Sequence, residues 1–313
     1  MKLFNILIII FCIHLYSVTK EEYTRITWGK QTNLIGVKVY EDGSGWGPDT
    51  FEINNKGHLI LPDVIRGDIQ IFNKDGKLIK LIENTNQWPR MIYDIVTDNN
   101  GDIIFYASDG NFIKVSFISS TIMFKKEKIK HTGRIKLDDE NNIYASRQCF
   151  SPNGKTLNFN ERKSNPKIKR LLDEGNEIEI HEKVENRRKK KLSLKQPKKV
   201  LFEINDNSGQ DFYFQLLDTL PLSDDVKSKL RNSGSSPLGT VKSGGTVWYW
   251  PTSGYKGMLM FYMNPIGQVT DYVYEDYSQY LRMILKIGKD GNLYAYTPHE
   301  KDGVIIWKYT FDE

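Results

Sequence analysis

The chain has 313 residues, of which 39% are hydrophobic and 12% aromatic, and its formal net charge is +5. It contains two cysteines, Cys12 and Cys149, and Cys12 lies in an apolar stretch at the N-terminus. Removing that stretch leaves Cys149 without a partner, which excludes an internal disulfide in the mature chain. The chain is long enough for a large core, so its stability must come from packing.

Residues 1–19 are predicted to form a secretory signal. Met1-Lys2 is a short basic start, and Leu3–Val18 is nearly all apolar. A charged start followed by a short apolar stretch is typical of such signals. We expect cleavage after Ser17 or Thr19 and a mature protein that is periplasmic or extracellular. The alternative is an uncleaved membrane anchor, although a membrane helix needs roughly 20 apolar residues. No other segment has the composition of a membrane span.

Residues 20–313 are predicted to form one domain of repeated β-hairpins. Each copy has a turn rich in Gly, Asn or Asp between two apolar strands, and such turns favour hairpins. The copies centre on Gly57, Gly101, Asn141, Gly245 and Gly291. Hairpins that recur roughly every 40–50 residues indicate the blades of a β-propeller.

A second turn follows within most copies, which indicates blades of four strands, a to d. We assign the first turn to strands a and b, and the second to strands c and d. The second turns centre on Gly76, Ser119-Ser120, Gly154, Gly209 and Gly267. The turn at Gly209 has an a–b partner only near Gly175, in a stretched blade. We therefore expect six blades, or five if residues 163–199 are only an insertion.

The last blade lacks an outer strand. After Gly291 the sequence provides strand b at Leu293–Tyr296 and strand c at Val304–Thr310, and then it stops. Because an open sheet edge is a liability, we expect the ring to be closed by an N-terminal strand. Tyr23–Trp28 and Leu34–Tyr40 are the candidates. The predicted fold is an all-β propeller closed between its N- and C-terminal strands.

The first blade resembles an NHL repeat. Residues 46–63 read WGPDTFEINNKGHLILPD, and residues 68–78 read DIQIFNKDGKL. This is similar to the NHL pattern G-P-x-x-[FI]-x-V-D-x-x-G-x-[IL]-[YL]-[VL]-x-D with a following strand R-[IV]-x-V-[FY]. Pro62 and Gly67-Asp68 depart from the pattern, and the other blades match it only at their turns. The resemblance implies a propeller that is a ligand-binding module or, less often, a metal-dependent hydrolase or lyase.

Long, varied loops are predicted on one face of the propeller. The b–c and d–a connections share this loop face, whereas the tight a–b and c–d turns share the opposite turn face. Loops on a rigid scaffold usually carry function, so we expect the site on the loop face near the axis. Trp46, Trp88 and Arg90 are the candidate binding residues. The two tryptophans either line the axial mouth or cover the ends of strands.

A basic insertion at about 161–199 supplies the positive charge of the chain. It holds 14 Lys or Arg against 7 Asp or Glu, so the remainder of the chain has a net charge of −2. Positive charge is densest in the run of five consecutive basic residues Arg187, Arg188, Lys189, Lys190 and Lys191. Such a run binds acidic polysaccharide, anionic membrane or phosphates, or is simply a solvated loop. The segment has no interleaved aromatic residues, which argues against nucleic acid.

No motif for catalysis is readable. The sequence has no G-x-S-x-G, H-E-x-x-H or phosphate-binding loop, and His58, His131, His181 and His299 lack metal-ligand spacing. Asp98–Asp102 is similar to part of a calcium loop, but Asp109 stands where such a loop has a bidentate Glu, and the other blades use the same position as a hairpin turn, which we favour. We therefore favour a monomeric, non-catalytic binding or scaffold module without a cofactor. Its expected partner is a protein, a polysaccharide or an anionic surface.

The alternative function is a metal-dependent hydrolase of the lactonase-like propeller type. Such chemistry needs a divalent cation, such as calcium, in the axial channel to polarise a carbonyl and activate water. Its ligands would be Glu, Asp and Asn side chains from several blades. They are scattered in the sequence, which leaves them unassigned.

Overall fold

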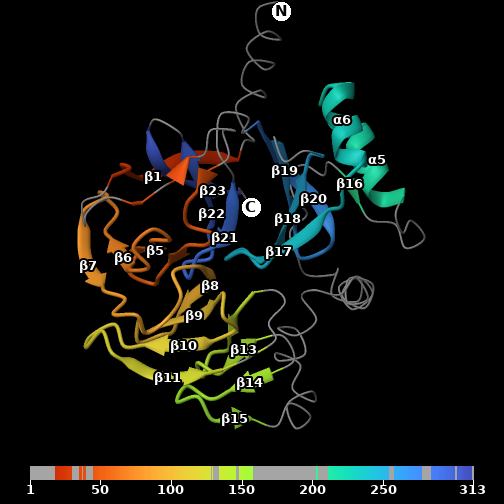
Figure 1. Ribbon diagram of the computed structural model, residues 1–313. Helices are drawn as coiled ribbons and strands as arrows, with labels where there is room; N and C mark the ends of the chain where they lie inside the picture. Colours follow the sequence, from red (N-terminus) through yellow and green to blue (C-terminus); the bar gives the residue numbers. More distant parts are fainter. Residues whose placement is uncertain are drawn as a thin grey trace, which may run out of the picture.

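The computed structural model describes residues 18–29, 35–36, 38–39, 45–127, 129, 134–145, 148–157, 202–203, 211–253, 257–276, 283–299 and 302–311. Within these residues five antiparallel sheets of four or five strands are arranged around a common centre (Figure 1). The structure is a β-propeller, as predicted. Residues 1–17 of the predicted signal, the basic insertion and the predicted turns at Gly175 and Gly209 lie outside the described residues.

The blades follow one another along the chain. Blade one comprises β4 (Glu52–Ile53), β5 (Leu59–Pro62), β6 (Ile69–Phe72) and β7 (Leu78–Ile82). Blade two comprises β8 (Ile92–Thr97), β9 (Ile103–Ala107), β10 (Phe112–Val115) and β11 (Ile122–Lys126). Blade three comprises β12 (Lys136–Leu137), β13 (Ile143–Ala145), β14 (Gln148–Phe150) and β15 (Thr156–Leu157).

Blades four and five complete the ring. Blade four comprises β17 (Ser236–Thr240), β18 (Thr246–Pro251), β19 (Gly257–Met263) and β20 (Gln268–Asp276), with β16 (Phe202–Glu203) paired outside β20. Blade five comprises β21 (Ile284–Ile287), β22 (Leu293–His299), β23 (Gly303–Thr310) and β1 (Thr19–Ile26). A separate two-stranded ribbon joins β2 (Lys38–Val39) to β3 (Gly45–Trp46).

The five a–b turns have one geometry. In blade one the N–H of Asn54 donates to the carbonyl of His58 at 3.1 Å, and the N–H of Gly57 donates to the carbonyl of Asn54 at 2.9 Å. The same pair of bonds recurs at Asp98–Asp102, Asp138–Asn142, Val241–Gly245 and Gly288–Asn292. The fourth turn residue has φ between +61° and +86°, so it is Gly or Asn. In blade four this residue is Gly244, one position before the predicted Gly245.

The N-terminal strand closes the ring, as predicted. β1 pairs antiparallel with β23 from Thr19↔Thr310 to Ile26↔Val304. The side chains of Tyr23 and Ile26 are buried in the core that blades one and five share. Of the two candidate segments, the one beginning at Tyr23 supplies the closing strand, and the strand starts four residues earlier than expected.

The described strands form five blades, the smaller of the two numbers that the sequence allowed. Phe202–Glu203, assigned from the sequence to an extra blade ahead of the Gly209 turn, is instead an outer strand of blade four. It pairs antiparallel with β20 in the register Phe202↔Val269. The prediction of a sixth blade was wrong because it relied on the spacing of turns, and an outer strand can pair with a blade that belongs to a different repeat.

Two helices interrupt the all-β pattern between β16 and β17. They are α5 (Asp211–Thr219) and α6 (Asp224–Arg231). Leu216, Leu217 and Leu230 are fully buried against the blade-four sheet, with Trp248, Trp250 and Phe261 in the same cluster. The apolar face of the helices therefore packs on this blade. No helix in the described residues is long and apolar enough to cross a membrane.

Candidate functional site

Charged side chains from the innermost strands meet at the centre of the propeller. The ammonium of Lys286, on β21, lies 3.2 Å from a carboxylate oxygen of Glu52, on β4, and 3.2 Å from one of Asp94, on β8. It also donates to the carbonyl of Ile95. We call Glu52, Asp94 and Lys286 the axial cluster.

The partners of Lys286 show that the cluster lies on the axis. Blades five and two are separated in the ring by blade one, so the Lys286–Asp94 contact crosses the centre. A second contact also crosses the centre. The Arg134 guanidinium of blade three donates to the carbonyl of Leu285 of blade five at 3.2 Å, and blade four separates these two blades in the ring. With five blades, the inner strands come close enough for their side chains to close the axis at this level.

The cluster is buried and its hydrogen bonds are satisfied. Glu52 is 3% exposed, Asp94 6% and Lys286 9%. A lysine ammonium has three N–H donors, and Lys286 has three acceptors in Glu52, Asp94 and the Ile95 carbonyl. Burying charges is costly unless they are paired and hydrogen-bonded. The arrangement therefore holds blades one, two and five together through one cation.

Asp94 extends the cluster to blade three. Its second carboxylate oxygen accepts the N–H of Ile135 at 2.5 Å, and its first accepts its neighbour's N–H, that of Ile95, at 3.0 Å. The hydroxyl of Thr50 in blade one lies 3.5 Å from that first oxygen. Asp94 thus bonds to groups from blades one, two, three and five, and both of its oxygens are engaged.

The register of the blades explains why these residues meet. Glu52 and Lys286 each stand two residues before the first residue of their a–b turn, and Asp94 and Arg134 each stand four residues before theirs. None of the four was predicted from the sequence, although counting back from the turns aligns them in two pairs. Equivalent positions in other blades carry Val96, Lys136 and Gly239, so the pattern is not a repeated motif.

Burial changes the acid–base behaviour of this site. It raises the pKa of Glu52 to about 7, because desolvation of the carboxylate outweighs the attraction of Lys286 and Lys289, while Asp94 adds repulsion. Burial also lowers the pKa of Lys289, against the opposing attraction of Glu52 and Asp98. Glu52 is therefore the group at the axis that titrates near neutral pH.

We expect Glu52 to make stability pH-dependent. Its pKa is higher in the folded state, about 7, than its ordinary value of 4.5, so its stabilising contribution is complete below pH 4.5 and is lost as pH rises through 7. A shift of this size corresponds to about 3 kcal/mol. The free energy of unfolding of the parent, minus that of Glu52→Gln, should fall by about that amount between pH 4.5 and 8. Urea unfolding at several pH values measures it, and a constant difference would contradict the assignment.

A second buried ion pair lies in blade two and reaches blade three through a backbone carbonyl. The Lys114 ammonium is 2.8 Å from a carboxylate oxygen of Asp98 and 3.6 Å from one of Asp102, and it donates to the Pro152 carbonyl at 3.2 Å. The other Asp98 oxygen accepts the N–H groups of Asn100 and Asp102. The segment considered as a calcium loop therefore forms the hairpin turn common to all five blades, with a lysine at its carboxylates.

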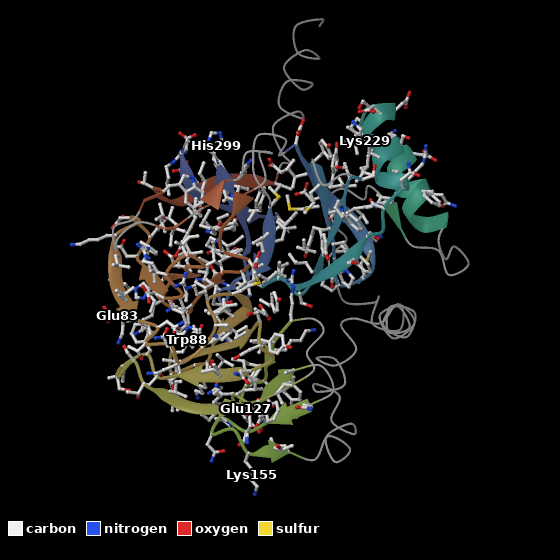
Figure 2. The ribbon with its side chains drawn as sticks, viewed as in Figure 1. Glu83, Trp88, Glu127, Lys155, Lys229 and His299 are labelled. Atoms are coloured by element: carbon white, nitrogen blue, oxygen red, sulfur yellow. The ribbon has the colours of Figure 1, made fainter. Side chains whose placement is uncertain are left out.

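Of the residues predicted to bind a partner, the structure describes the side chains of Trp88 and Arg90. Trp88 is buried between blades one and two (Figure 2), donates to the Gly67 carbonyl at 3.0 Å and packs edge-on against Phe105. Arg90 is exposed. Trp46 is described only by its backbone in β3, and Arg187, Arg188, Lys189, Lys190 and Lys191 lie outside the described residues.

Among the described residues, no group of three or more His, Cys, Asp and Glu side chains has the arrangement of a metal site. The axial carboxylates of Glu52 and Asp94 come from two blades and converge, as ligands for a cation would. Here both are paired with Lys286.

No protein-family model matches the chain, and no curated protein matches it. Solved structures similar to it include a streptogramin B lyase, with 12% identity, a TM-score of 0.35, and coverage of 94% of this chain and 98% of that one. BamB from Moraxella catarrhalis has 8% identity, a TM-score of 0.38, and coverage of 95% and 98%. A catalytically inactive virginiamycin B lyase from Staphylococcus aureus with quinupristin has 11% identity, a TM-score of 0.35, and coverage of 95% and 100%.

Proposed function

We propose that this protein is a non-catalytic binding or scaffold propeller that works outside the cytoplasm. The observation that carries the proposal is the ammonium of Lys286 between Glu52 and Asp94. In the lactonase-like alternative a divalent cation would take that place and supply the electrophile. A lysine with its three donors satisfied fixes the blades instead, which leaves the loops to bind a partner.

The proposal includes an NHL-type origin for the blades. Asp63, the last residue of the pattern in blade one, is fully buried, and its carboxylate accepts the N–H groups of Ile65 at 2.9 Å and Arg66 at 3.0 Å. It also accepts the N–H of Gly36 at 3.0 Å. These bonds hold the connection between strands b and c. The pattern residue therefore has a structural role, consistent with a repeat used as scaffold.

The proposed partner is a protein, a polysaccharide or another anionic surface, and the proposed binding element is the basic segment Arg187–Lys191. Clustered lysines and arginines attract anions over a distance of about 8–10 Å at physiological salt. We further propose that residues 1–19 direct export and that the mature protein is monomeric. The alternative function, a metal-dependent hydrolase, keeps one supporting observation, which is the convergence of Glu52 and Asp94 on the axis.

Replacing Arg187, Arg188 and Lys189–Lys191 by glutamine is expected to abolish retention on immobilised heparin and on anionic vesicles at physiological salt. The parent should bind, and its affinity should fall steeply as salt rises, because clustered charges are screened together. The melting temperature should change little.

The control variant replaces five other exposed lysines by glutamine: Lys56, Lys77, Lys125, Lys155 and Lys229. Lys155, for example, projects from the end of blade three (Figure 2). This control has the same net charge as the test variant and should keep most of the binding. Equal retention of the test variant and the parent would exclude the basic segment as the binding element. No retention of the parent would exclude an anionic partner of this kind.

A further inference from the structure

The outer edge of blade two exposes large apolar side chains beside an edge strand. β11 is the last strand of this blade and lies on the outside of the ring (Figure 1). Met123 on β11 is 52% exposed, and Ile118 in the preceding c–d turn is 87% exposed. An edge strand presents unpaired backbone N–H and C=O groups, so it is a template for pairing with another strand. We call Ile118, Ile122 and Met123 the blade-two edge.

The c–d turn that carries Ile118 is held in place. Within the turn, the N–H of Ser116 donates to the carbonyl of Thr121 at 2.9 Å. The Lys80 ammonium, on β7 of blade one, donates to the Ile118 carbonyl at 2.9 Å and lies 4.9 Å from the centroid of the Phe117 ring. The Ile118 side chain therefore projects from a fixed turn, which reduces the entropy lost when a partner contacts it.

Blade four shows what such an edge binds. Its outer strand, β20, has β16 paired antiparallel outside it, in the register Phe202↔Val269 and Glu203↔Gln268. Val269 and Gln268 are both buried. These two residues come directly before a β-bulge of β20, in which Thr270 is the extra residue. A bulge limits pairing along an edge, but here it leaves the first two residues of the strand open to a fifth strand.

The blade-two edge has the same geometry with its first residues uncovered. Met123 is the extra residue of a β-bulge in β11, so Ile122 corresponds to Val269 and Thr121 to Gln268. Ile122 is half-buried and Thr121 is exposed, whereas their counterparts in blade four are buried. No strand among the described residues pairs outside β11. The blade-two edge is therefore equivalent to the place that β16 occupies in blade four.

The edge of blade one differs in its turn. Its bulge residue, Ile79, is 43% exposed, but its c–d turn presents the charged side chains of Lys74 and Asp75 where blade two has Ile118. Burying charged side chains without partners is costly. An apolar strand therefore fits blade two better, and blade one provides a matched comparison.

The charge beside the bulge indicates the chemistry of the partner. Lys125 is exposed and stands two residues after Met123 on β11. A strand that pairs with Ile122 as β16 pairs with Val269 has its N-terminal side toward Lys125. Complementary charge across an interface favours the right partner and its register. The partner strand should therefore carry an acidic residue ahead of its apolar one.

We propose that the blade-two edge binds an extended segment of a partner protein, which adds to β11 as a fifth strand. The segment places a large apolar residue opposite Ile122, as Phe202 lies opposite Val269, and an acidic residue toward Lys125. Strand addition to an exposed sheet edge is a recurring mode of peptide recognition. The site is separate from the basic segment, so it goes beyond the function proposed above.

The test is NMR titration of the mature protein, labelled at its isoleucine and methionine methyl groups. The first probe is the peptide VLFEIND, which has the sequence of residues 200–206, and the second is the same peptide with Val200→Glu. Both should shift the methyl signals of Ile118, Ile122 and Met123. The second should bind about threefold more tightly, the size expected for an exposed ion pair, and Lys125→Gln should remove this gain. A third probe, N-methylated at Leu201, Phe202 and Glu203, keeps the side chains without the N–H donors and should not bind.

The double variant Ile118→Ser and Met123→Ser should weaken binding of VLFEIND about tenfold, because it removes two apolar contacts. The matched control, Ile79→Ser on blade one, should bind as the parent does. All three side chains are exposed, so the folded state should be kept in every variant.

Unshifted methyl signals at the blade-two edge, equal binding of the N-methylated peptide, or unchanged affinity in the double variant would overturn the proposal. So would shifts confined to Met263 in blade four, since they would report only exchange with β16. Shifts of the blade-two signals on raising the protein concentration without peptide would assign the edge to a second copy of the chain and overturn the assignment to a partner protein. Heparin binding is scored separately, so failure here leaves the basic segment as it stands.

Discussion

Replacing Lys286 by methionine is expected to lower the free energy of unfolding by about 3–5 kcal/mol, because the change leaves two buried carboxylates without their cation. Methionine preserves most of the apolar stem, so lost packing contributes little. The loss should be greater at pH 8 than at pH 5, since Glu52, with a pKa of about 7, is protonated at the lower pH. Chemical denaturation at both pH values measures the effect.

A double variant tests the mechanism of this loss. Combining Lys286→Met with Glu52→Gln removes one of the two orphaned charges, so the pair should be more stable than Lys286→Met alone at pH 8. The matched control is Lys77→Met, a lysine that is exposed in the blade-one turn and should cost less than about 0.5 kcal/mol. Equal stabilities of Lys286→Met and the parent would show that the axial cluster does not hold the ring.

Replacing Ile26 by aspartate is expected to abolish cooperative unfolding or to lower the free energy of unfolding by more than about 4 kcal/mol. Ile26 is 2% exposed and lies in the core between blades five and one. A charge there is buried without a partner and weakens the pairing of β1 with β23. Because β1 is the outer strand of the last blade, its loss opens the ring and exposes the edge of β23.

The control for the closing strand is Glu21→Gln. Glu21 lies on the same strand, but its side chain is 48% exposed, and its carboxylate lies 3.1 Å from the Lys308 ammonium. An exposed ion pair contributes about 0–1 kcal/mol, so this variant should unfold almost as the parent does. Size-exclusion chromatography would show expansion or aggregation of Ile26→Asp. A cooperative transition at the parent's midpoint would contradict the role of β1.

The repeated turns made the fold predictable. Gly57, Gly101 and Gly291 have positive φ in the structure, a conformation that few residues adopt, so their spacing indicated the blades directly. The closing strand followed from the missing outer strand of the last blade. These features depend on local chemistry and on simple topology, both of which can be read from one sequence.

Helix α6 could have been found in the sequence. Ser223 caps α6 by accepting the N–H of Val226, and the helix has acidic residues in its first turn and basic ones in its last. This pattern is typical of a helix start and end. It was overlooked because the surrounding repeats favoured strands and loops.

The axial cluster could not be predicted in the same way. Glu52, Asp94 and Lys286 are separated by up to 234 residues, and their meeting depends on how many blades surround the axis. Uncertainty over five or six blades changes which inner strands face each other. The basic segment was easy to read as a charge run, but no chemistry in it indicates a particular partner.

A crystal structure of the mature protein, grown with calcium in the solution, tests the central claim most directly. We predict five blades closed by β1, with the Lys286 ammonium within hydrogen-bond distance of Glu52 and Asp94 and no cation between them. A calcium ion bound by Glu52 and Asp94, with Lys286 turned away, would contradict the claim. That result would favour the metal-dependent hydrolase over the binding module.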